Sequence, residues 1–301
     1  MKKDLLSLDD LTLEEMLRLF KVTDELKAKV RDVSHALAAK CLGLIFLKPS
    51  LRTRVSFEAA MAHLGGAAFY LPPEDIKFGT RESVKDIGHV LSRYLDAIVI
   101  RTFSQKQVEE LAVNTTIPVI NGLTDLCHPC QALSDLYTIK EKKGTLKNLR
   151  LVFVGDGNNI VHSLLHGCAK IGVDFTVATP EKYKPQAAIV KEALEMAKVS
   201  GAKISLTDDP LAAARGADVL YTDVWTSMGR ETEREERRKS FQGFQINDKL
   251  VSLAKPDCLV MHCLPAHRGE EITDEVIDGP HSVVFDQAEN RMHVQKAILL
   301  F

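Results

Sequence analysis

The chain has 301 residues, of which 27% are charged and 45% apolar, as in an ordinary globular protein with room for two packed domains. Its formal net charge of −2 provides no basic excess to neutralise a phosphate backbone, so we expect no nucleic-acid partner. No apolar run reaches the length of a membrane span and the N-terminus lacks the apolar core of a signal peptide, so we expect a cytoplasmic protein with no membrane partner.

The first half of the chain alternates predicted helices and strands. Thr12 and Glu15 have the spacing of a capping box in front of a helix. The apolar face of that helix is predicted at Leu13, Met16, Leu17 and Phe20. Strands are predicted at residues 42–47, 67–71, 97–100 and 117–120. Further helices are predicted from residue 55 to the glycines at 65 and 66, over residues 84–94, and after a cap formed by Ser104 with Gln107, while residues 72–80 are expected to form a polar loop.

The second half repeats this alternation. Residues 131–143 are predicted to form a linking helix and residues 288–300 a terminal one. Strands are predicted at residues 149–154, 174–178, 203–206, 219–224, 259–263 and 282–285. Residues 230–240 are nearly all charged and lack an apolar stripe, so we expect a mobile surface loop or an exposed helix.

The alternation predicts an α/β protein with two doubly wound parallel-sheet domains joined by interdomain helices. We place the first domain at residues 1–132 and the second at residues 133–285, with the linking helix in the second. The C-terminal helix, about residues 286–301, is expected to pack back onto the first domain.

A strand-to-helix junction at residues 48–54 is the strongest candidate for an anion site. The first N–H groups of a helix lack partners within the helix and point at whatever binds there. Ser50 and Thr53 add hydroxyl groups at this point, and Arg52 and Arg54 add guanidinium groups that suit phosphate oxygens. An ordinary capped helix with solvated charges is the alternative interpretation.

Other polar residues follow predicted strands, where ligands of doubly wound sheets bind. Arg101 would add a second guanidinium group beside the junction. His128 and Gln131 stand at a helix start and are candidates to donate hydrogen bonds to a carbonyl oxygen. Cys127 and Cys130 form one C-x-x-C pair, which needs distant ligands to bind zinc, so metal and redox roles remain minor alternatives. The six scattered cysteines fit reduced thiols.

Three further clusters lie in the second half. Residues 155–159 resemble a dinucleotide-binding turn, but Ile160 replaces the third glycine, so Asn158 or Asn159 is the better candidate for binding a substrate carboxylate. Asp223 suits either a helix cap or a ligand ammonium group. Cys263 is by default a structural cysteine, and it would need a base such as His262 or His128 to act as a nucleophile.

Four motifs together resemble those of the ornithine carbamoyltransferase family, within the aspartate/ornithine carbamoyltransferase superfamily. They are residues 50–54, 128–131, 223–229 and 262–265, and the similarity extends to residues 288–291. The resemblance implies transfer of the carbamoyl group from carbamoyl phosphate to the δ-amine of L-ornithine, giving L-citrulline and phosphate. It implies arginine biosynthesis, although the same residues would serve arginine breakdown. It also implies a homotrimer or a multiple of trimers, without cofactor or metal.

The resemblance assigns roles to individual residues. The first domain would bind carbamoyl phosphate through Ser50, Leu51, Arg52, Thr53, Lys77, Arg101, His128 and Gln131, with Cys263, Leu264 and Arg291 completing the site. The second would bind ornithine through Asn159, Asp223, Ser227 and Met228. Catalytic roles would belong to Arg52, Thr53, Arg101, His128 and Cys263.

Two positions depart from the family pattern. Leu51 stands where threonine is usual, and Lys77 stands where glutamine is common, in a loop that resembles one reaching a neighbouring subunit's site. We expect altered phosphate affinity. A carbamoyltransferase for putrescine or N-acetylornithine is the alternative, and a non-catalytic anion-binding protein of the same fold is a further one.

Overall fold

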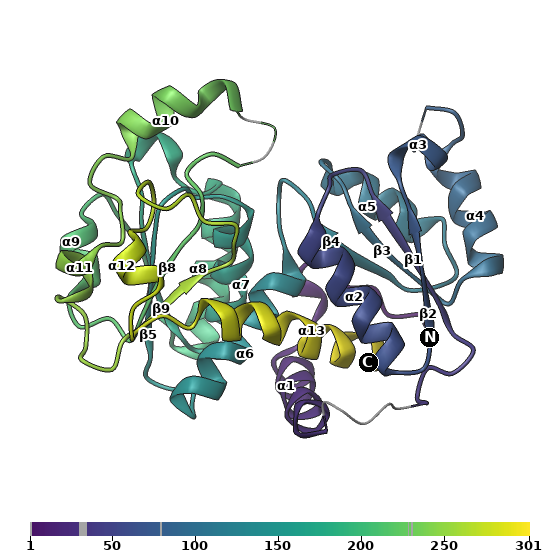
Figure 1. The fold of residues 1–301 in the computed structure, drawn as a ribbon, viewed down its shortest axis with the longest axis horizontal. Coiled ribbons are helices and arrows are strands. Elements are labelled where there is room, and N and C mark those ends of the chain that lie inside the picture. The colour runs from purple at the N-terminus through teal and green to yellow at the C-terminus, as the bar shows by residue number, and fades with distance from the viewer. Residues whose placement is uncertain (1, 30–34, 79, 228, 230) are drawn as a thin grey trace. The chain divides into compact units, whose positions relative to one another are not determined.

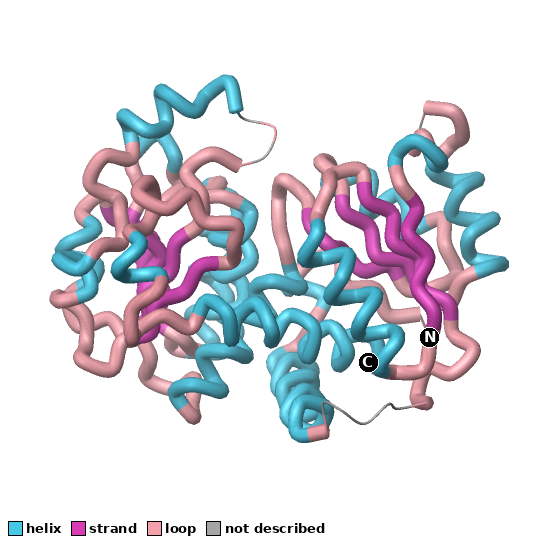
Figure 2. The backbone as a smooth tube through the Cα atoms, in the orientation of Figure 1, coloured by secondary structure: helices cyan, strands magenta, loops and turns pink. Residues whose placement is uncertain are grey.

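The computed structural model describes residues 2–29, 35–78, 80–227, 229 and 231–301, and it divides into two compact units. One unit comprises Met1–Ser134 with Asn290–Phe301, and the other comprises Asp135–Glu289. Helices α6 (Pro129–Lys143) and α13 (Val284–Leu300) continue from one unit into the other. Each unit contains a parallel sheet flanked by helices, which confirms the predicted fold class (Figures 1 and 2).

The first unit has a four-stranded parallel sheet in the order β2-β1-β3-β4. Its strands are β1 (Cys41–Phe46), β2 (Ala67–Leu71), β3 (Ala97–Arg101) and β4 (Val119–Leu123). Its helices include α1 (Leu13–Ala28), α2 (Leu51–His63), α4 (Val84–Tyr94) and α5 (Gln105–Val113). Because the chain passes from β1 to β2 on one side and returns to β3 on the other, the strand order reverses between β1 and β3, where ligands of such sheets bind.

The second unit has a five-stranded parallel sheet in the order β7-β6-β5-β8-β9. Its strands are β5 (Arg150–Val154), β6 (Asp174–Ala178), β7 (Ile204–Thr207), β8 (Val219–Thr222) and β9 (Leu259–His262). Its helices include α7 (Asn159–Ile171), α8 (Ala187–Ser200), α9 (Pro210–Ala214), α10 (Arg234–Ser240), α11 (Asp248–Val251) and α12 (Asp274–Ile277). Here the order reverses between β5 and β8.

Several local predictions were wrong for identifiable reasons. The expected loop 72–80 contains a short helix, α3 (Pro73–Ile76), because proline presets the backbone angle of a first helical position. The strand predicted at 282–285 is absent from the described residues: Ser282 makes one bridge to Val260, and α13 begins at Val284. A short apolar run does not distinguish a strand from the start of a buried helix.

Two predictions about helix ends and faces also need correction. The capping box of Thr12 and Glu15 is confirmed, but α1 leaves Leu13 and Leu17 exposed and buries Leu19 instead. Ser104 makes no capping bond through its side chain. Gln107 instead accepts a hydrogen bond from the hydroxyl of Thr102 at 2.6 Å. In the part of the chain described here, no helix is both long and apolar enough to cross a bilayer.

Candidate active site

In the first unit, the strand-to-helix junction lies at the point where the sheet order reverses. Helix α2 begins at Leu51, four residues earlier than predicted, and the Ser50 hydroxyl caps it by accepting from the Thr53 N–H at 3.3 Å. Arg52 and Thr53 therefore belong to the first helical turn. The strand register pairs Phe46 with Arg101, so Arg101 lies beside the end of β1. The junction and Arg101 thus share one edge of the sheet.

Arg101 is a buried cation among other cations. Its side chain is 5% exposed, and burial together with Arg291 and Arg52 lowers its pKa to about 10. A shift in the β3–β4 register falls between Ile100 and Arg101, an irregularity of the kind that re-aims a side chain. Among the described residues, the Nε of Arg101 has no hydrogen-bond partner. This guanidinium group is therefore suited to an anionic ligand, since the part of the chain that the structure describes pairs no carboxylate with it.

His128 and Arg291 complete the cluster of side chains around Arg101. His128 is buried, and burial followed by Arg291 and Arg101 lowers its pKa well below the usual range, so the imidazole is neutral at pH 7. Arg291, on α13, donates from Nη2 to the Thr53 hydroxyl at 2.6 Å. Gln131 is buried in the first turn of α6. We call Arg52, Thr53, Arg101, His128 and Arg291 the cationic cluster.

Three candidate residues of the first unit lie outside the cationic cluster: Leu51, Lys77 and Arg54. Leu51 is 76% exposed at the start of α2. Lys77 is exposed at the end of α3 with a left-handed backbone. Arg54 pairs with Glu58 at 2.9 Å and lies over the ring of Tyr70 at 3.8 Å, so its guanidinium group is already engaged.

The C-x-x-C pair is unsuited to redox chemistry. Cys127 and Cys130 are both buried free cysteines. Burial raises the pKa of each thiol to about 12. Since the thiolate is the reactive form, both remain inert at neutral pH, which argues against the redox alternative.

In the second unit, the loops after β5, β8 and β9 bring polar groups together. The register pairs Thr222 with His262, so the next residues, Asp223 and Cys263, follow adjacent strands. Asn158 joins the β5 loop to the β8 loop, because its Nδ2 donates to Asp223 Oδ2 at 2.8 Å. The Asp223 Oδ1 accepts from the Val224 N–H at 2.8 Å, a local turn that ends β8 earlier than predicted.

Two of the remaining predicted ornithine residues, Asn159 and Ser227, lie near this edge. Asn158 caps α7, since its Oδ1 accepts from Ile160 and Val161, and Asn159 is the first residue of that helix. Ser227 is half-buried four residues after Asp223. Met228 lies outside the described residues.

Cys263 is held as a thiol. Burial, followed by Asp223, raises the pKa of Cys263 well above the ordinary thiol range, although the residue keeps part of its accessible surface. Leu264 follows with a left-handed backbone, φ 56°. Cys263 and Leu264 belong to the second unit, and their part in the carbamoyl phosphate site stays a prediction.

His262 is fixed by two hydrogen bonds. Its Nδ1 accepts from the Leu264 N–H at 2.9 Å, so the proton is on Nε2, which donates to the buried Glu271 at 3.0 Å. The ligand atoms of Asp223, His262 and Cys263 lie within 4.8 Å of one another, a donor set that suits a metal ion in composition. His262 would have to give up one of its two hydrogen bonds to bind one. Because both ring nitrogens of His262 are engaged in these hydrogen bonds, His262 is also unsuited to act as a base for Cys263.

The glycine turn after β5 has a packing explanation. A Cβ on Gly157 would come within 2.3 Å of the Pro185 nitrogen, so only glycine fits against this neighbouring loop. The close backbone approach is thus to the protein's own chain. This removes the main reason for interpreting residues 155–159 as a dinucleotide-binding turn.

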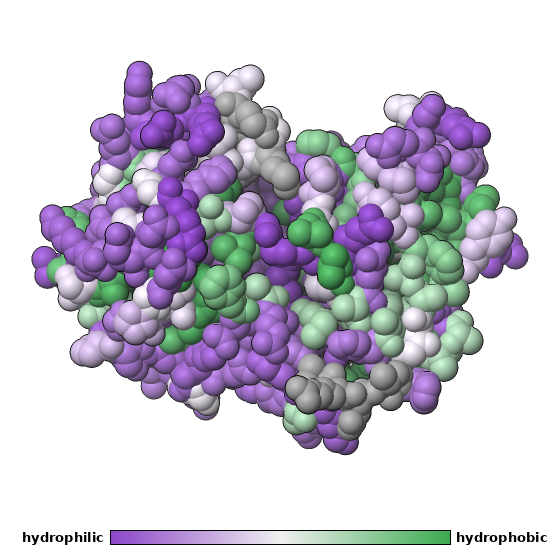
Figure 3. Space-filling view, in the orientation of Figure 1, coloured by the Kyte–Doolittle hydropathy of each residue, from purple (hydrophilic) through white to green (hydrophobic). Residues whose placement is uncertain are grey.

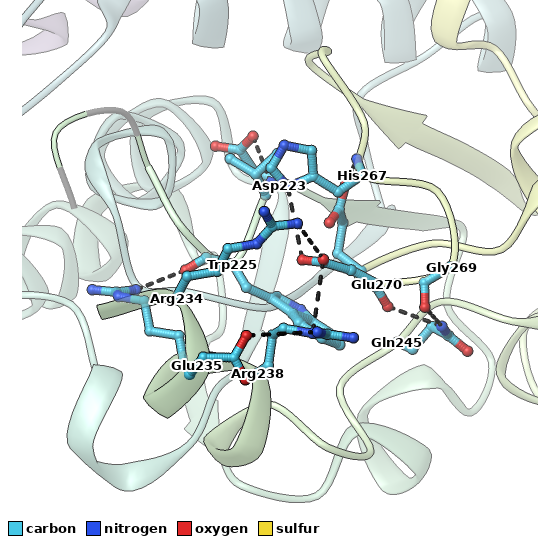
Figure 4. Close-up of polar contacts among 12 residues, drawn as sticks. Asp223, Trp225, Arg234, Glu235, Arg238, Gln245, His267, Gly269 and Glu270 are labelled. Carbon is cyan, nitrogen blue, oxygen red and sulfur yellow. Dashed lines mark hydrogen bonds and ion pairs between the residues drawn. The ribbon is translucent and has the colours of Figure 1, made fainter. Parts of the chain in front are cut away.

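The charged segment 230–240 is not simply a surface element. Most of it forms a 3₁₀ turn at Glu231–Glu233 followed by α10, whereas Arg230 lies outside the described residues. Figure 4 shows Arg234 and Arg238 of α10 pointing toward Glu270, with ion-pair distances of 2.7 and 3.8 Å. Arg237, in contrast, is only 1% exposed. Sequence reasoning missed this residue, and the only signal was its spacing of four from Glu233, which fits an ion pair on one helix face.

Comparison with known proteins gives a consistent result. Residues 3–141 match the aspartate/ornithine carbamoyltransferase carbamoyl-P binding domain, and residues 147–301 match the Asp/Orn binding domain. The anabolic ornithine carbamoyltransferase of Pyrococcus furiosus is 54% identical over 99% of this chain and 95% of its own length. The ornithine carbamoyltransferase of Bacillus subtilis is also 54% identical, over 99% of this chain and 92% of its own length.

Solved structures agree with these sequence matches. The ornithine carbamoyltransferase from Pyrococcus furiosus has a TM-score of 0.96 at 55% identity, over 99% of this chain and 96% of that chain. The anabolic enzyme from Campylobacter jejuni has a TM-score of 0.94 at 40% identity, over 99% and 98% of the two chains.

Proposed function

This chain belongs to the aspartate/ornithine carbamoyltransferase family, and from that membership we propose that it transfers the carbamoyl group of carbamoyl phosphate to the δ-amine of L-ornithine. The products are L-citrulline and phosphate. The observation that carries this proposal is the cationic cluster, in which three arginines lie around a capped helix start and no anion among the described residues neutralises Arg101. Such a cluster is suited to a phosphorylated substrate.

The first unit is proposed to bind carbamoyl phosphate. Ser50, Arg52 and the first N–H groups of α2 hold the phosphate, and Thr53, Arg101 and His128 donate to the carbonyl oxygen. A neutral His128 donates a hydrogen bond without adding a further charge to the cluster. Gln131 and Arg291 support the same substrate, with Lys77, Leu51, Cys263 and Leu264 as further proposed contacts.

The second unit is proposed to bind L-ornithine. Asp223 holds the α-ammonium group, and Asn159 at the start of α7 holds the α-carboxylate, where the helix dipole favours a negative charge. Asn158 supports this arrangement because it bonds to Asp223 and caps α7 at once. Ser227 and Met228 are assigned to the same substrate.

The chemical step is a direct displacement. The neutral δ-amine attacks the carbamoyl carbon, a C–N bond forms and the C–O bond to phosphate breaks. The proton that the amine loses passes to the departing phosphate. The bond electrons leave with the phosphate, whose charge the guanidinium groups stabilise. Cys263, with its raised pKa, remains a thiol and takes no covalent part.

Assembly and location are also proposed. We assign a cytoplasmic homotrimer, or a multiple of trimers, acting in arginine biosynthesis. Apolar side chains of the first unit support self-association, since Leu51, Val55 and Phe69 are 76%, 50% and 50% exposed, and Figure 3 shows apolar surface in the region of α2 and β2. Light scattering tests the mass, and a monomer would contradict this assignment.

The test of the proposed function is citrulline and phosphate release from carbamoyl phosphate with a panel of amines. L-Ornithine should react much faster than putrescine, which lacks the α-carboxylate, and N-acetylornithine, which lacks the α-ammonium group. Preference for either alternative amine would move the function to that acceptor. Phosphate binding without turnover of any amine would indicate a non-catalytic anion-binding protein.

A further inference from the structure

We infer that Arg237 is a positioning residue for L-ornithine, which holds the loops after β5 and β8 in one arrangement. The inference rests on the proposed function, because it assigns those two loops to ornithine. The hydrogen bonds of Arg237 go to Asp156, Trp225 and Glu233, and not to Asn159, Asp223 or Ser227, which are the proposed ornithine residues that the structure describes. The residue is 1% exposed. Arg237 thus bonds to the side chain of Asp156 and to the backbone of Trp225, which flank the proposed ligand residues in sequence.

The guanidinium group contacts three segments of the second unit outside its own helix, at Asp156, Trp225 and Tyr183, and it also bonds to Glu233 at the start of that helix. From Nη1 it donates to Asp156 Oδ2 at 2.8 Å and to the carbonyl oxygen of Trp225, also at 2.8 Å. From Nε it donates to Glu233 at 2.9 Å. Its carbon centre lies 4.7 Å from the ring centroid of Tyr183. One side chain therefore bonds to the β5 loop and the β8 loop, and anchors its own helix to both.

These contacts close a ring around the proposed ornithine site. Asp156 lies two residues before Asn158, and Trp225 lies two residues after Asp223. Asn158 in turn bonds to Asp223 at 2.8 Å. The β5 and β8 loops are thus joined twice, once at the ligand residues and once through Arg237. Without the link through Arg237, the two loops are held together less firmly, and the spacing of the carboxylate and ammonium partners can change.

The geometry requires arginine and not merely a positive charge. A guanidinium group presents five N–H donors in a planar fork, whereas lysine ends in one flexible ammonium group. Lysine at position 237 retains the charge but cannot hold Asp156, the Trp225 carbonyl and Glu233 in the same geometry. Substitution of a buried, multiply bonded arginine by lysine is therefore not conservative.

Trp225 provides a readout that is independent of activity. It is the only tryptophan of the chain, it is 6% exposed, and its ring stacks on Phe241 with centroids 5.7 Å apart. If Arg237 holds the β8 loop, then Arg237→Lys should shift the tryptophan emission to longer wavelength and increase its quenching by acrylamide. A stability role elsewhere in the unit would leave this signal unchanged in the folded protein.

The kinetic test uses the full-length enzyme with both substrates varied. For Arg237→Lys we expect the KM for L-ornithine to rise by about 10- to 100-fold, because a displacement of about 1 Å has effects of that size. The KM for carbamoyl phosphate should stay within about twofold of the wild type. Asp156→Asn keeps the side-chain shape and removes the charge that pairs with Arg237, so it should also raise the KM for L-ornithine selectively. This variant replaces Arg237→Lys in the test if Arg237→Lys folds poorly.

Arg238→Lys is the matched control, since it makes the same substitution at the next residue of α10. Its side chain is 52% exposed and its ion-pair contacts are 3.8 Å, so we expect no change in either KM or in tryptophan emission. Suppose that the wild type makes citrulline. If Arg237→Lys then has a normal KM for ornithine, or if its KM values for both substrates rise equally, the inference about Arg237 is wrong while the proposed function stands. If the wild type makes no citrulline from ornithine, the proposed function fails and the inference falls with it.

Discussion

Two buried arginines, one in each unit, have opposite electrostatic surroundings. Arg101 is 5% exposed, and burial together with two neighbouring arginines lowers its pKa to about 10. Arg237 is 1% exposed; burial lowers its pKa, but Asp156 and Glu233 outweigh burial and raise it. A cation buried among cations is stabilised when an anion binds, whereas one buried among carboxylates is already neutralised.

The comparison shows that burial of an arginine does not by itself indicate its role. The sign of the neighbouring charges separates a residue prepared for a ligand from one that organises the protein. Removal of the two side chains should therefore have opposite consequences for stability and activity.

Loss of Arg237 should destabilise the fold strongly. Arg237→Met leaves Asp156 buried without its cation, so the free energy of unfolding should fall by about 3–5 kcal/mol. Urea denaturation followed by circular dichroism measures the change. Arg238→Met, which removes an exposed charge from the same helix, should change it by less than about 0.5 kcal/mol. Equal effects of the two variants would show that the Arg237 ion pair is no stronger than a surface pair.

Loss of Arg101 should affect turnover instead. Arg101→Met should reduce kcat/KM by ~10²–10³, because a donor to the developing charge is lost. The free energy of unfolding should be unchanged or higher, because repulsion from Arg52 and Arg291 is relieved. Arg54→Met is the control, since that guanidinium group is already paired with Glu58. Ordinary activity in Arg101→Met would contradict its assignment to the cationic cluster.

The rate should depend on pH in a defined direction. Only the neutral amine attacks, and an alkyl ammonium group has a pKa of about 10.4, so kcat/KM for ornithine should rise about tenfold per unit between about pH 6.5 and about pH 8.5. Above a pH of about 10, Arg101 loses its proton and kcat/KM for carbamoyl phosphate should decline. Initial rates with each substrate varied separately measure both the rise of kcat/KM for ornithine and the decline of kcat/KM for carbamoyl phosphate. A flat ornithine profile across neutrality would be incompatible with attack by a free amine.

Replacement of the thiol in the second unit should have a smaller effect. Cys263→Ser keeps a hydrogen-bonding group, so the rate should fall by no more than about tenfold, the value of one hydrogen bond. Mass spectrometry of quenched wild-type enzyme should show no carbamoyl adduct on this residue. Detection of such an adduct would make Cys263 a nucleophile and overturn the direct displacement.

The smallest change is expected at the exposed start of α2. Leu51→Thr restores a side-chain donor beside the phosphate position, so the KM for carbamoyl phosphate should fall by about two- to tenfold. The ornithine KM should be unchanged. Leu51→Val, which alters shape without adding a hydroxyl, is the control. A rise in the carbamoyl phosphate KM of Leu51→Thr would argue that position 51 does not face the phosphate.

Much of the fold could be predicted because apolar runs, and the turn-forming residues that end them, are local features of the sequence. The strands at 67–71 and 174–178 and the helix at 84–94 were placed at their observed bounds. The failures came where a local pattern has two solutions. The run 282–285 suits a strand or a buried helix start, and only packing of the complete chain decides between them.

The α/β class, the alternation of strands and helices, and the residue types at the strand ends follow from local sequence patterns, because periodicity and turn chemistry are short-range properties. The tertiary structure alone decided which charges meet. It placed Arg101 beside Arg52 and Arg291, and it buried Arg237 against Asp156, 81 positions earlier in the chain. The burial of a side chain and the sign of the charges around it depend on strand order and register, which no local segment encodes.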